Sequence, residues 1–275
     1  MNKKSSQKKW YNVIMIKHSE NPLVFNTAIG TKKRNETVVP KEVLCPFCDV
    51  ENLTGILKTS DHKIWLKNKF PTLKNSMMTV IIESDEHLGD ISTYGVEENR
   101  EVFSFAFECW DEMIQSGKYQ SVLMFKNFGP RSGGTLRHPH LQVVGLEETD
   151  GYAQIAKENF EGVEIRKNGL TVTLSTRPIM GFVEFNVIIS ELENVEKLAD
   201  NVHGITSYLM TDYMNGRCDS YNLFFHHFDD KYICKIVPRF ITSPYFIGYK
   251  IPQVNGIEAL EGIADEIRNR LDKKY

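Results

Sequence analysis

The chain has 275 residues, 41% of them hydrophobic, which is enough to bury a sizeable core in one large α/β domain or two smaller ones. With a formal net charge of -3 it lacks the broad basic field that gathers nucleic acid, so we expect no nucleic-acid partner. No run approaches the roughly eighteen apolar residues of a membrane span, and the basic start leads into no apolar leader, so no membrane partner is expected.

The first forty residues are interpreted as an N-terminal tail and a basic loop. Residues 10–16 are strand-like, whereas Lys17 to Val39 is rich in Asn, Thr, Lys, Arg and Gly and has weak periodicity. That composition predicts either a solvated connector or an anion-binding arm built from Lys32, Lys33 and Arg34, and the sequence leaves both open.

A Cys-x-x-Cys pair follows at Cys45 and Cys48. Two thiolates at this spacing on a turn can hold one Zn²⁺, but four-coordinate zinc needs two more ligands. The competing redox interpretation requires a helix starting at the first cysteine, and residues 49–55 do not have that pattern. The five cysteines, an odd number, argue against a secreted disulfide scaffold, so we expect a cytoplasmic protein with reduced thiols.

Two strands and a helix are predicted next. Lys63 to Lys67 alternates as a strand, and Asn75 to Ile82 is apolar on both faces, which predicts a central strand. That second strand ends at a polar loop containing His87, the kind of place where a buried strand holds a site residue. Apolar side chains at three- and four-residue spacing then predict a helix from Gly95 to Ser116.

The segment from Ser121 to Gly145 combines a strand, a glycine-rich turn and a second strand. Its turn can bring backbone N–H groups close to a ligand, as phosphate-binding turns do. The turn residues are Gly129, Pro130, Gly133 and Gly134. In the following strand, alternation puts His138, His140 and Gln142 on one face. Two histidines on a strand are most often structural, so this pattern gains its meaning from the rest of the chain.

The second half repeats this order in outline, which indicates a duplicated unit whose second copy lacks the two histidines. Its predicted elements are strands at 170–175 and 182–189, a helix at 190–214, strands at 220–225 and 232–238, and a terminal helix at 256–273.

Four features in one order resemble the galactose-1-phosphate uridylyltransferase family, a branch of the histidine-triad superfamily. They are Cys45-x-x-Cys48, His87 after a strand, Asn127 just before a glycine-rich turn, and His138-Pro139-His140-x-Gln142. Four features in register are much harder to obtain by chance than one. The resemblance is specific from Cys45 to Gln142 and weaker over the second half, where it is best at residues 246–249.

The resemblance implies an α+β fold made of two histidine-triad-like α/β halves, each an antiparallel sheet with flanking helices, arranged as an internal duplication. Residues 1–40 are then the tail and basic loop. Residues 41–150 form the catalytic half with the zinc site, and residues 151–275 form the second, degenerate half.

Site residues follow from the same resemblance. One structural zinc per chain is implied, bound by Cys45, Cys48, His87 and His138 as a closed tetrahedron. His140 is implied as the nucleophile that attacks the α-phosphorus of a nucleoside diphosphate compound, and Gln142 donates a hydrogen bond to a phosphate oxygen. In the resemblance Asn127 and Thr135 lie at the phosphates and Asn68 at the nucleotide. Arg34 is a further candidate for substrate binding, through the possible anion-binding arm of the basic loop.

The sequence also departs from the family. Leu141 stands where the family has glycine, on the face away from the reacting group. Tyr232 to Lys235 occupies the place of a second metal site that some members carry, so we predict no second metal. Lys250 replaces a glutamate that contacts the hexose, which argues against galactose 1-phosphate as the acceptor.

The sequence therefore predicts a nucleotidyltransferase that works through a covalent nucleotidyl-histidine intermediate, with a nucleotide or nucleotide-sugar substrate and an acceptor other than galactose 1-phosphate. One alternative is a dinucleoside polyphosphate hydrolase or phosphorylase, which the stretch from Asn68 to Pro71 also suits. Another is a zinc-stabilised nucleotide-binding protein without turnover, against which an intact His140 and Gln142 count. The family also suggests a homodimer.

Overall fold

The first half of the chain contributes five strands and one long helix to the fold. The computed structural model describes residues 22–37 and 45–274. The elements of the first half are β1 (Ile56–Ser60), β2 (Lys63–Lys67), β3 (Ser76–Ile82), α2 (Val96–Gln115), β4 (Ser121–Phe128) and β5 (His140–Leu146). These bear out the strands and the helix predicted between residues 63 and 144, whereas the strand predicted at residues 10–16 lies outside the described residues.

The second half repeats the set. Its elements are β6 (Gly162–Lys167), β7 (Thr171–Ser175), β9 (Phe185–Ile189), α3 (Val195–Thr211), β10 (Tyr221–Phe228) and β11 (Lys231–Pro238). Smaller pieces are α1 (Thr27–Thr37), β8 (Gly181–Phe182), α4 (Pro244–Tyr249) and β12 (Gln253–Val254), and the chain closes with α5 (Ile257–Lys274).

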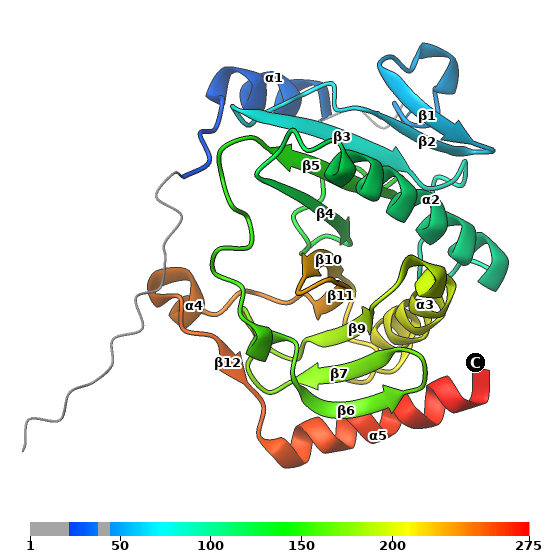
Figure 1. Cartoon of the computed structure of the whole chain (residues 1–275), viewed down its shortest axis with the longest axis vertical. Helices are drawn as coiled ribbons and strands as arrows, with labels where there is room; N and C mark the ends of the chain where they lie inside the picture. Colours follow the sequence, from blue (N-terminus) through cyan, green and yellow to red (C-terminus); the bar gives the residue numbers. More distant parts are fainter. Residues whose placement is uncertain (1–21, 38–44, 275) are drawn as a thin grey trace, which may run out of the picture.

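Ten strands form one antiparallel sheet in the order β1-β2-β3-β5-β4-β10-β11-β9-β7-β6 (Figure 1). Read inward from its two edges, each half connects its strands in the same way: 1-2-3-5-4 on one side and 6-7-9-11-10 on the other. In each half the long helix follows the third strand in the chain: α2 connects β3 to β4, and α3 connects β9 to β10. This symmetry confirms the predicted duplication and the α+β class, and the pairing of β4 with β10 joins the halves.

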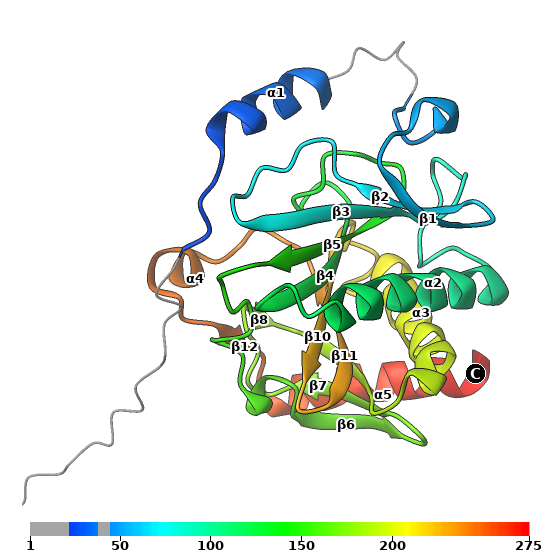
Figure 2. The ribbon, with the colours of Figure 1, turned by 45° about the horizontal axis from the view of Figure 1, so that its top comes forward.

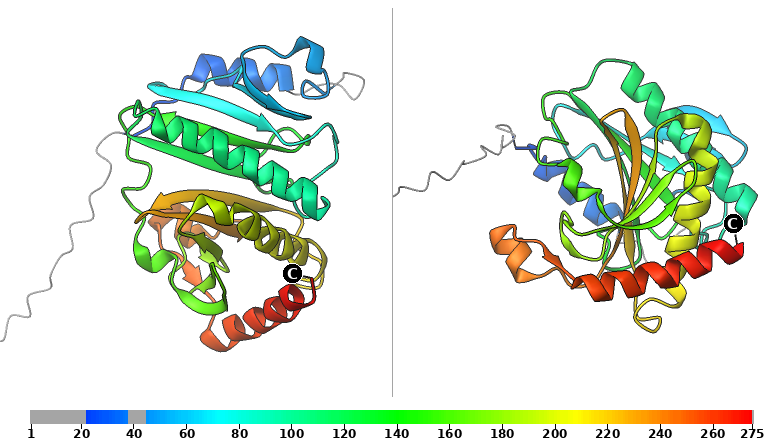
Figure 3. Two further views of the ribbon diagram at one scale, coloured as in Figure 1. Left: turned by 45° about the vertical axis from the view of Figure 1, so that its right-hand side comes forward. Right: turned by 60° about the horizontal axis from the view of Figure 1, so that its bottom comes forward.

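One face of the sheet is covered by α2 and α3, which pack side by side, while α5 packs against α3 and β6 (Figure 3). The apolar core lies between these helices and the sheet and runs through both halves. Trp110 at its centre is fully buried, and its indole nitrogen donates to the Val122 carbonyl at 3.0 Å. The aromatic stripe predicted for the first helix is therefore core.

The other face of the first half carries a small apolar cluster. It consists of Ile64, Leu66, Val80 and Ile82, and it is covered by Phe47 and Leu53 from the segment that contains the Cys-x-x-Cys pair. That segment therefore packs onto the sheet face opposite the helices. None of the helices that the structure describes combines the length and the apolar character that a membrane crossing requires.

Two predicted elements need correction. Residues 27–37 form the helix α1 rather than a loop. The Asn26 side chain accepts a hydrogen bond from the Ile29 N–H at 3.3 Å, as a helix N-cap does, and α1 lies apart from α2 and α3 (Figure 2). Because α1 has no apolar stripe to bury, hydrophobic periodicity gave no sign of it.

The strand predicted at 182–189 is interrupted, so that only Phe185–Ile189 joins the large sheet. The carboxylate of Glu184 accepts hydrogen bonds from the backbone N–H groups of residues 179, 180 and 181, at 2.9, 2.7 and 3.2 Å. Those bonds fold the preceding backbone into a turn, in which Phe182 takes a positive φ of 58°. Strands β1 and β6 and helix α4 were not predicted.

A buried charged network ties the end of β3 to the centre of the sheet. Lys126 is 1% exposed, and its Nζ lies 2.5 Å from Glu83 and 3.4 Å from Asp90. The hydroxyl of Tyr221 in β10 donates to Asp90 at 2.8 Å. Burial raises the pKa of Glu83, and the Lys126 ammonium opposes that rise. Each charge in this network is therefore buried with an opposite charge.

Removing the cation should be costly. We expect Lys126→Ala to lower the free energy of unfolding by roughly 3 to 5 kcal/mol, because it leaves buried carboxylates uncompensated. Lys58→Ala is the control, since Lys58 pairs with Glu108 and Glu112 at the surface, where such pairs contribute under about 1 kcal/mol. Urea unfolding of both variants measures the difference, and equal losses would contradict the role given to Lys126.

Candidate functional site

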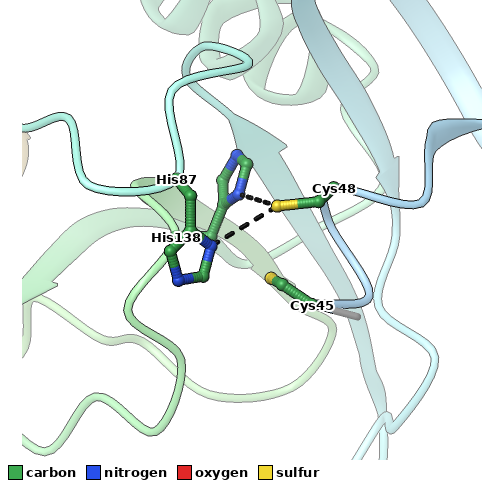
Figure 4. Close-up of side chains that lie close together, drawn as sticks. All are labelled: Cys45, Cys48, His87 and His138. Atoms are coloured by element: carbon green, nitrogen blue, oxygen red, sulfur yellow. Dashed lines mark hydrogen bonds between the residues drawn. The ribbon is translucent and has the colours of Figure 1, made fainter. Parts of the chain in front are cut away.

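Four side chains from three separate segments meet at one point: Cys45, Cys48, His87 and His138 (Figure 4). One ligand atom from each lies within 4.8 Å of the ligand atoms of the others. The Sγ of Cys48 is 3.4 Å from the Nδ1 of His87 and 3.4 Å from the Nδ1 of His138. The structure thus brings the four predicted metal ligands together.

The spacing and the donor types fit a tetrahedral metal ion. Zn–S bonds of about 2.3 Å and Zn–N bonds of about 2.0 to 2.1 Å place a sulfur and a nitrogen roughly 3.5 Å apart around zinc. The observed Sγ to Nδ1 separations of 3.4 Å match that value. The cluster can therefore hold one metal ion, and two thiols with two imidazoles are a donor set that suits zinc.

The hydrogen bond at the back of His138 fixes its tautomer. Its Nε2 lies 2.8 Å from the carbonyl of Ser84, and a carbonyl can only accept, so Nε2 carries the proton. The Nδ1 lone pair then points at Cys48. Burial lowers the pKa of His138, which keeps the imidazole neutral, and neutral imidazole is the form that binds metals. Burial likewise raises the pKa of Cys48, with a smaller contribution from Cys45.

His140 is held by the same residue. Its Nδ1 lies 2.8 Å from the carbonyl of His138, so Nδ1 donates and the lone pair of the ring is on Nε2. Phe47, between the two cysteines, contacts both imidazoles edge-on, with ring centroids 5.9 Å from His138 and 5.4 Å from His140. The Cys-x-x-Cys turn therefore touches the proposed nucleophile as well as the metal ligand.

The loop that carries His87 is anchored from two sides. Ser84 and Glu83 stand at its start, and Glu83 belongs to the buried network with Lys126. At its end, the guanidinium of Arg137 donates to the carbonyls of Leu88 and Gly89, at 2.9 and 3.3 Å. The sequence did not predict that Glu83, Lys126 and Arg137 support the site. For Lys126 a signal was available, because a lysine within an otherwise apolar strand indicates a buried charge.

Asn127 and Gln142 lie close to His140 in the sheet. Lys126 of β4 pairs with Leu141 of β5, which places Asn127 across from His140, and Gln142 is two positions further along the same face of β5. The Oδ1 of Asn127 accepts from the Asn222 side chain at 2.6 Å, which leaves its Nδ2 as a donor. Asn222 was not predicted.

The other predicted substrate contacts are more scattered. Thr135 is exposed in the loop between β4 and β5. Asn68 follows β2, and its backbone N–H donates to the carbonyl of Met78 in β3. His140 pairs with Ile82 of the same strand. Met78 and Ile82 are four residues apart, so about 13 Å along β3 separates the positions of Asn68 and His140. Arg34 belongs to α1, and its side chain lies outside the described residues.

The second half contributes a pocket that the sequence did not indicate. It has a volume of about 530 Å³ and lies over β4, β10 and β11, with Asn127, Asn222, His226 and Arg239 among its lining residues. Both ring nitrogens of His226 and the Nε of Arg239 are buried without a hydrogen-bond partner. Six separate stretches of chain between residues 123 and 246 form its walls, so no local motif could have revealed it.

Comparison with known proteins identifies relatives in sequence and in fold. The Domain of unknown function (DUF4931) N-terminal domain matches residues 25–149, and the DUF4931 C-terminal domain matches residues 152–275. The crystal structure of a DUF4931 family protein from Bacillus cereus is 41% identical, with a TM-score of 0.71 over 78% of this chain and 98% of that chain. No curated protein matches the chain in sequence.

Two more distant structures have the same fold. An ADP-glucose phosphorylase from Arabidopsis thaliana with bound ADP-glucose is 13% identical, with a TM-score of 0.67 over 85% of this chain and 92% of that chain. A uridylyltransferase is 14% identical, with a TM-score of 0.65 over 86% of this chain and 93% of that chain. These likenesses confirm the fold that the resemblance to uridylyltransferases predicted.

The metal assignment has a direct test. We expect the purified chain to contain about one zinc ion, and the Cys45→Ser, Cys48→Ser double variant to lose it and to melt at a lower temperature, because structural zinc contributes to folding free energy. Elemental analysis and a thermal melt measure the two effects. Cys109→Ala is the control, since Cys109 is a buried core thiol outside the cluster. Stoichiometric zinc in the double variant would refute the assignment.

Proposed function

This chain belongs to the DUF4931 family, and we propose that it is a nucleotidyltransferase that passes a nucleoside monophosphate through a covalent intermediate on His140. One observation carries the proposal: the Nδ1 of His140 donates to the carbonyl of the residue whose ring completes the Cys/His cluster. The imidazole is thereby fixed in the tautomer whose Nε2 lone pair can attack phosphorus.

In the first half-reaction the Nε2 of His140 attacks the α-phosphorus of a nucleoside diphosphate compound. An N–P bond forms, the bond from that phosphorus to the bridging oxygen breaks, and the rest of the donor leaves with the electron pair. The ring keeps its Nδ1 proton throughout this step, so the phosphoramidate formed on Nε2 carries a positive charge on the imidazole, which the His138 carbonyl stabilises.

In the second half-reaction an oxygen of the acceptor attacks the same phosphorus and the N–P bond breaks, which returns His140 to its starting form. The Nδ2 of Asn127 and the side chain of Gln142 lie beside His140 and supply donors for the non-bridging oxygens. The backbone of the loop at residues 129–134 adds a turn that requires glycine, since a Cβ at Gly129 would stand 2.2 Å from the carbonyl of Asp219.

The metal has a structural part in this scheme. Zinc held by Cys45, Cys48, His87 and His138 would tie the Cys-x-x-Cys turn and the His87 loop to the strand that carries His140. Four protein ligands would leave no open position for water on the ion, which would make its part structural. The ring of Phe47 and the carbonyl of His138, both held in place by the cluster, then fix the orientation of the His140 ring.

A nucleoside diphosphate sugar is the donor class that we propose. The two distant relatives of the same fold are named for uridylyl transfer and for the phosphorolysis of ADP-glucose. A hydrolase or phosphorylase of dinucleoside polyphosphates would use the same histidine and would differ in the acceptor that removes the nucleotidyl group. Acceptor identity therefore separates these activities once the covalent intermediate has been isolated.

The nucleophile can be tested with a cavity variant. We expect His140→Gly to retain zinc and fold but to lose covalent labelling by radiolabelled UDP-glucose or ADP-glucose, because the lone pair that attacks phosphorus is gone. Added imidazole should restore part of the transfer by occupying the vacated space. Labelling is followed by acid-labile radioactivity on the protein, and peptide mapping identifies the modified residue.

His138→Gly is the matched comparison, since it removes the neighbouring histidine on the same segment. The His138→Gly variant should have a lower zinc content and a lower melting temperature. Imidazole should not restore transfer, because the ring of His138 belongs to the Cys/His cluster and does not attack phosphorus. A His140→Gly protein that labels at the native rate, or a label that maps to another residue, would rule out the mechanism.

Acceptor specificity should reflect Lys250. This residue follows α4 with a positive φ of 56° and is exposed. It borders a second pocket of about 470 Å³, which adjoins the 530 Å³ pocket because Ile179 and Phe246 line both. A carboxylate there could accept hydrogen bonds from sugar hydroxyls, whereas an ammonium only donates. We therefore expect galactose 1-phosphate to be a poor acceptor, and Lys250→Glu to improve kcat/KM for it by roughly tenfold or more.

Steady-state kinetics with galactose 1-phosphate as the varied acceptor measure this effect. Lys250→Gln serves as the control, because it removes the positive charge without supplying a carboxylate. If the unaltered protein transfers UMP from UDP-glucose to galactose 1-phosphate as efficiently as to other acceptors, the specificity argument is wrong.

A further inference from the structure

The sheet face opposite α2 and α3 carries the 530 Å³ pocket over β4, β10 and β11. We propose that this pocket binds the acceptor of the transfer reaction, and that the acceptor is an organic phosphate with a flat, aromatic body rather than a hexose phosphate. The inference rests on the proposed function, since an acceptor presupposes transfer. It adds a binding site in the second half and a substrate class.

The pocket begins beside the proposed nucleophile. Asn127 of β4 lies across from His140 and pairs on its other side with Asn222 of β10, and both asparagines line the pocket. Two strand spacings, about 10 Å, therefore separate the backbones of His140 and Asn222. One molecule can extend from the phosphorus on His140 into the pocket.

An anion is the group expected at this end. Arg239 donates through Nη1 to the Asn222 side chain at 2.7 Å and through Nη2 to Thr242 at 3.3 Å, and its Nε is buried without a partner. Within the described ranges Arg239 forms no ion pair, unlike Lys235 deeper in the pocket, which lies 2.9 Å from Glu184. A partly buried guanidinium without a carboxylate partner needs an anion to balance its charge. Phosphate suits it, because two phosphate oxygens can accept from two N–H groups of the guanidinium.

The guanidinium of Arg239 is connected to the neighbourhood of His140 by hydrogen bonds. Arg239 donates to Asn222, and Asn222 in turn donates to Asn127, the residue across from His140. An acceptor phosphate bound at Arg239 is thus held by the chain of amides that also positions Asn127. The acceptor oxygen and the nucleotidyl group can then meet at one point.

A second polar group, the imidazole of His226, lies at the end of the pocket away from Arg239. His226 lines the pocket four residues along β10 from Asn222, about 13 Å away, and is 7% exposed. Both of its ring nitrogens lack a hydrogen-bond partner, and the rings of Tyr152 and Phe160 pack against it at 5.7 and 5.1 Å. Burial beside Lys235 lowers the pKa of His226 to about 3, so the ring is neutral and offers one donor and one acceptor.

The walls between these two ends are apolar. Tyr152, Ile179, Phe224 and Phe246 line this part of the pocket, and the charges of Lys235 and Glu184 satisfy each other. A hexose would bring several hydroxyl groups against these walls without partners, which is unfavourable. A flat aromatic body between an anionic end and one distal hydrogen-bonding group fits the lining better.

Matched ligands test the inference by isothermal titration calorimetry on the zinc-loaded full chain. The probes are 2-naphthyl phosphate, 6-hydroxy-2-naphthyl phosphate and galactose 1-phosphate. We expect both naphthyl phosphates to bind at least tenfold more tightly than galactose 1-phosphate, and Arg239→Gln to weaken naphthyl binding at least tenfold. The distal hydroxyl should strengthen binding severalfold in the unaltered chain and give no gain in His226→Phe, which keeps a ring of similar size.

Arg270→Gln is the control for arginine removal, because Arg270 pairs with Asp212 at the surface away from the pocket. If Arg239→Gln does not fold, naphthyl phosphate binding by Arg239→Lys and the effect of the distal hydroxyl in His226→Phe still test the inference. Equal affinity for the hexose and naphthyl phosphates, or naphthyl binding that neither pocket variant changes, would overturn the inference.

Labelling of the unaltered chain by the nucleotide sugar is measured in parallel. Labelling without pocket-dependent naphthyl binding refutes only the acceptor pocket. Pocket-dependent naphthyl binding without labelling refutes the proposed transfer and leaves an aromatic phosphate site.

Discussion

His138 is held at three atoms, and the proposed catalytic arrangement depends on all three. Its Nδ1 faces Cys48, its Nε2 donates to the Ser84 carbonyl, and its own carbonyl accepts from the Nδ1 of His140. A shift of this one residue would therefore disturb the metal ligands, the His87 loop and the tautomer of the proposed nucleophile together. The buried pairing of Glu83 with Lys126 fixes Ser84 from behind, so the charged network and the cluster act as one support.

The two halves differ where the chain joins the last two strands of each. Between β4 and β5 the loop spans residues 129–139 and delivers both histidines, whereas β10 and β11 are joined by only Asp229 and Asp230, with φ of 50° and 55°. Such a two-residue turn with positive φ at both positions is the tight hairpin that matches strand twist. It leaves no room for a second histidine loop, and the unbroken β10 and β11 became the floor of a pocket.

Hydrophobic periodicity was sufficient to predict the long helices and most strands of the core, because buried faces such as that of α2 repeat at helical spacing. It did not predict β6, although Val163 and Ile165 of that strand are buried in the core. It failed for α1, which buries no stripe, and at Glu184, whose carboxylate folds the backbone through contacts that no pattern encodes. The Cys-x-x-Cys pair was ambiguous by itself, and only the fold brings His87 and His138 to it. The pocket at Arg239 and His226 depends on tertiary contacts between distant segments, so it was not predictable from sequence.

The junction of β4 with β10 joins the two family domains of the chain in one sheet. The halves share a continuous hydrogen-bonded sheet and a common core, so the half that carries His140 is packed directly against the half that supplies most of the pocket. Cutting the connection between them would expose a long, mostly buried edge strand on each piece, the kind of edge that pairs with another chain. A single half would satisfy that edge by pairing with its own copy across a two-fold axis. In this light the chain resembles a dimer of half-sized units fused into one, in which the first copy carries the Cys/His cluster and the second supplies most of the lining of the 530 Å³ pocket.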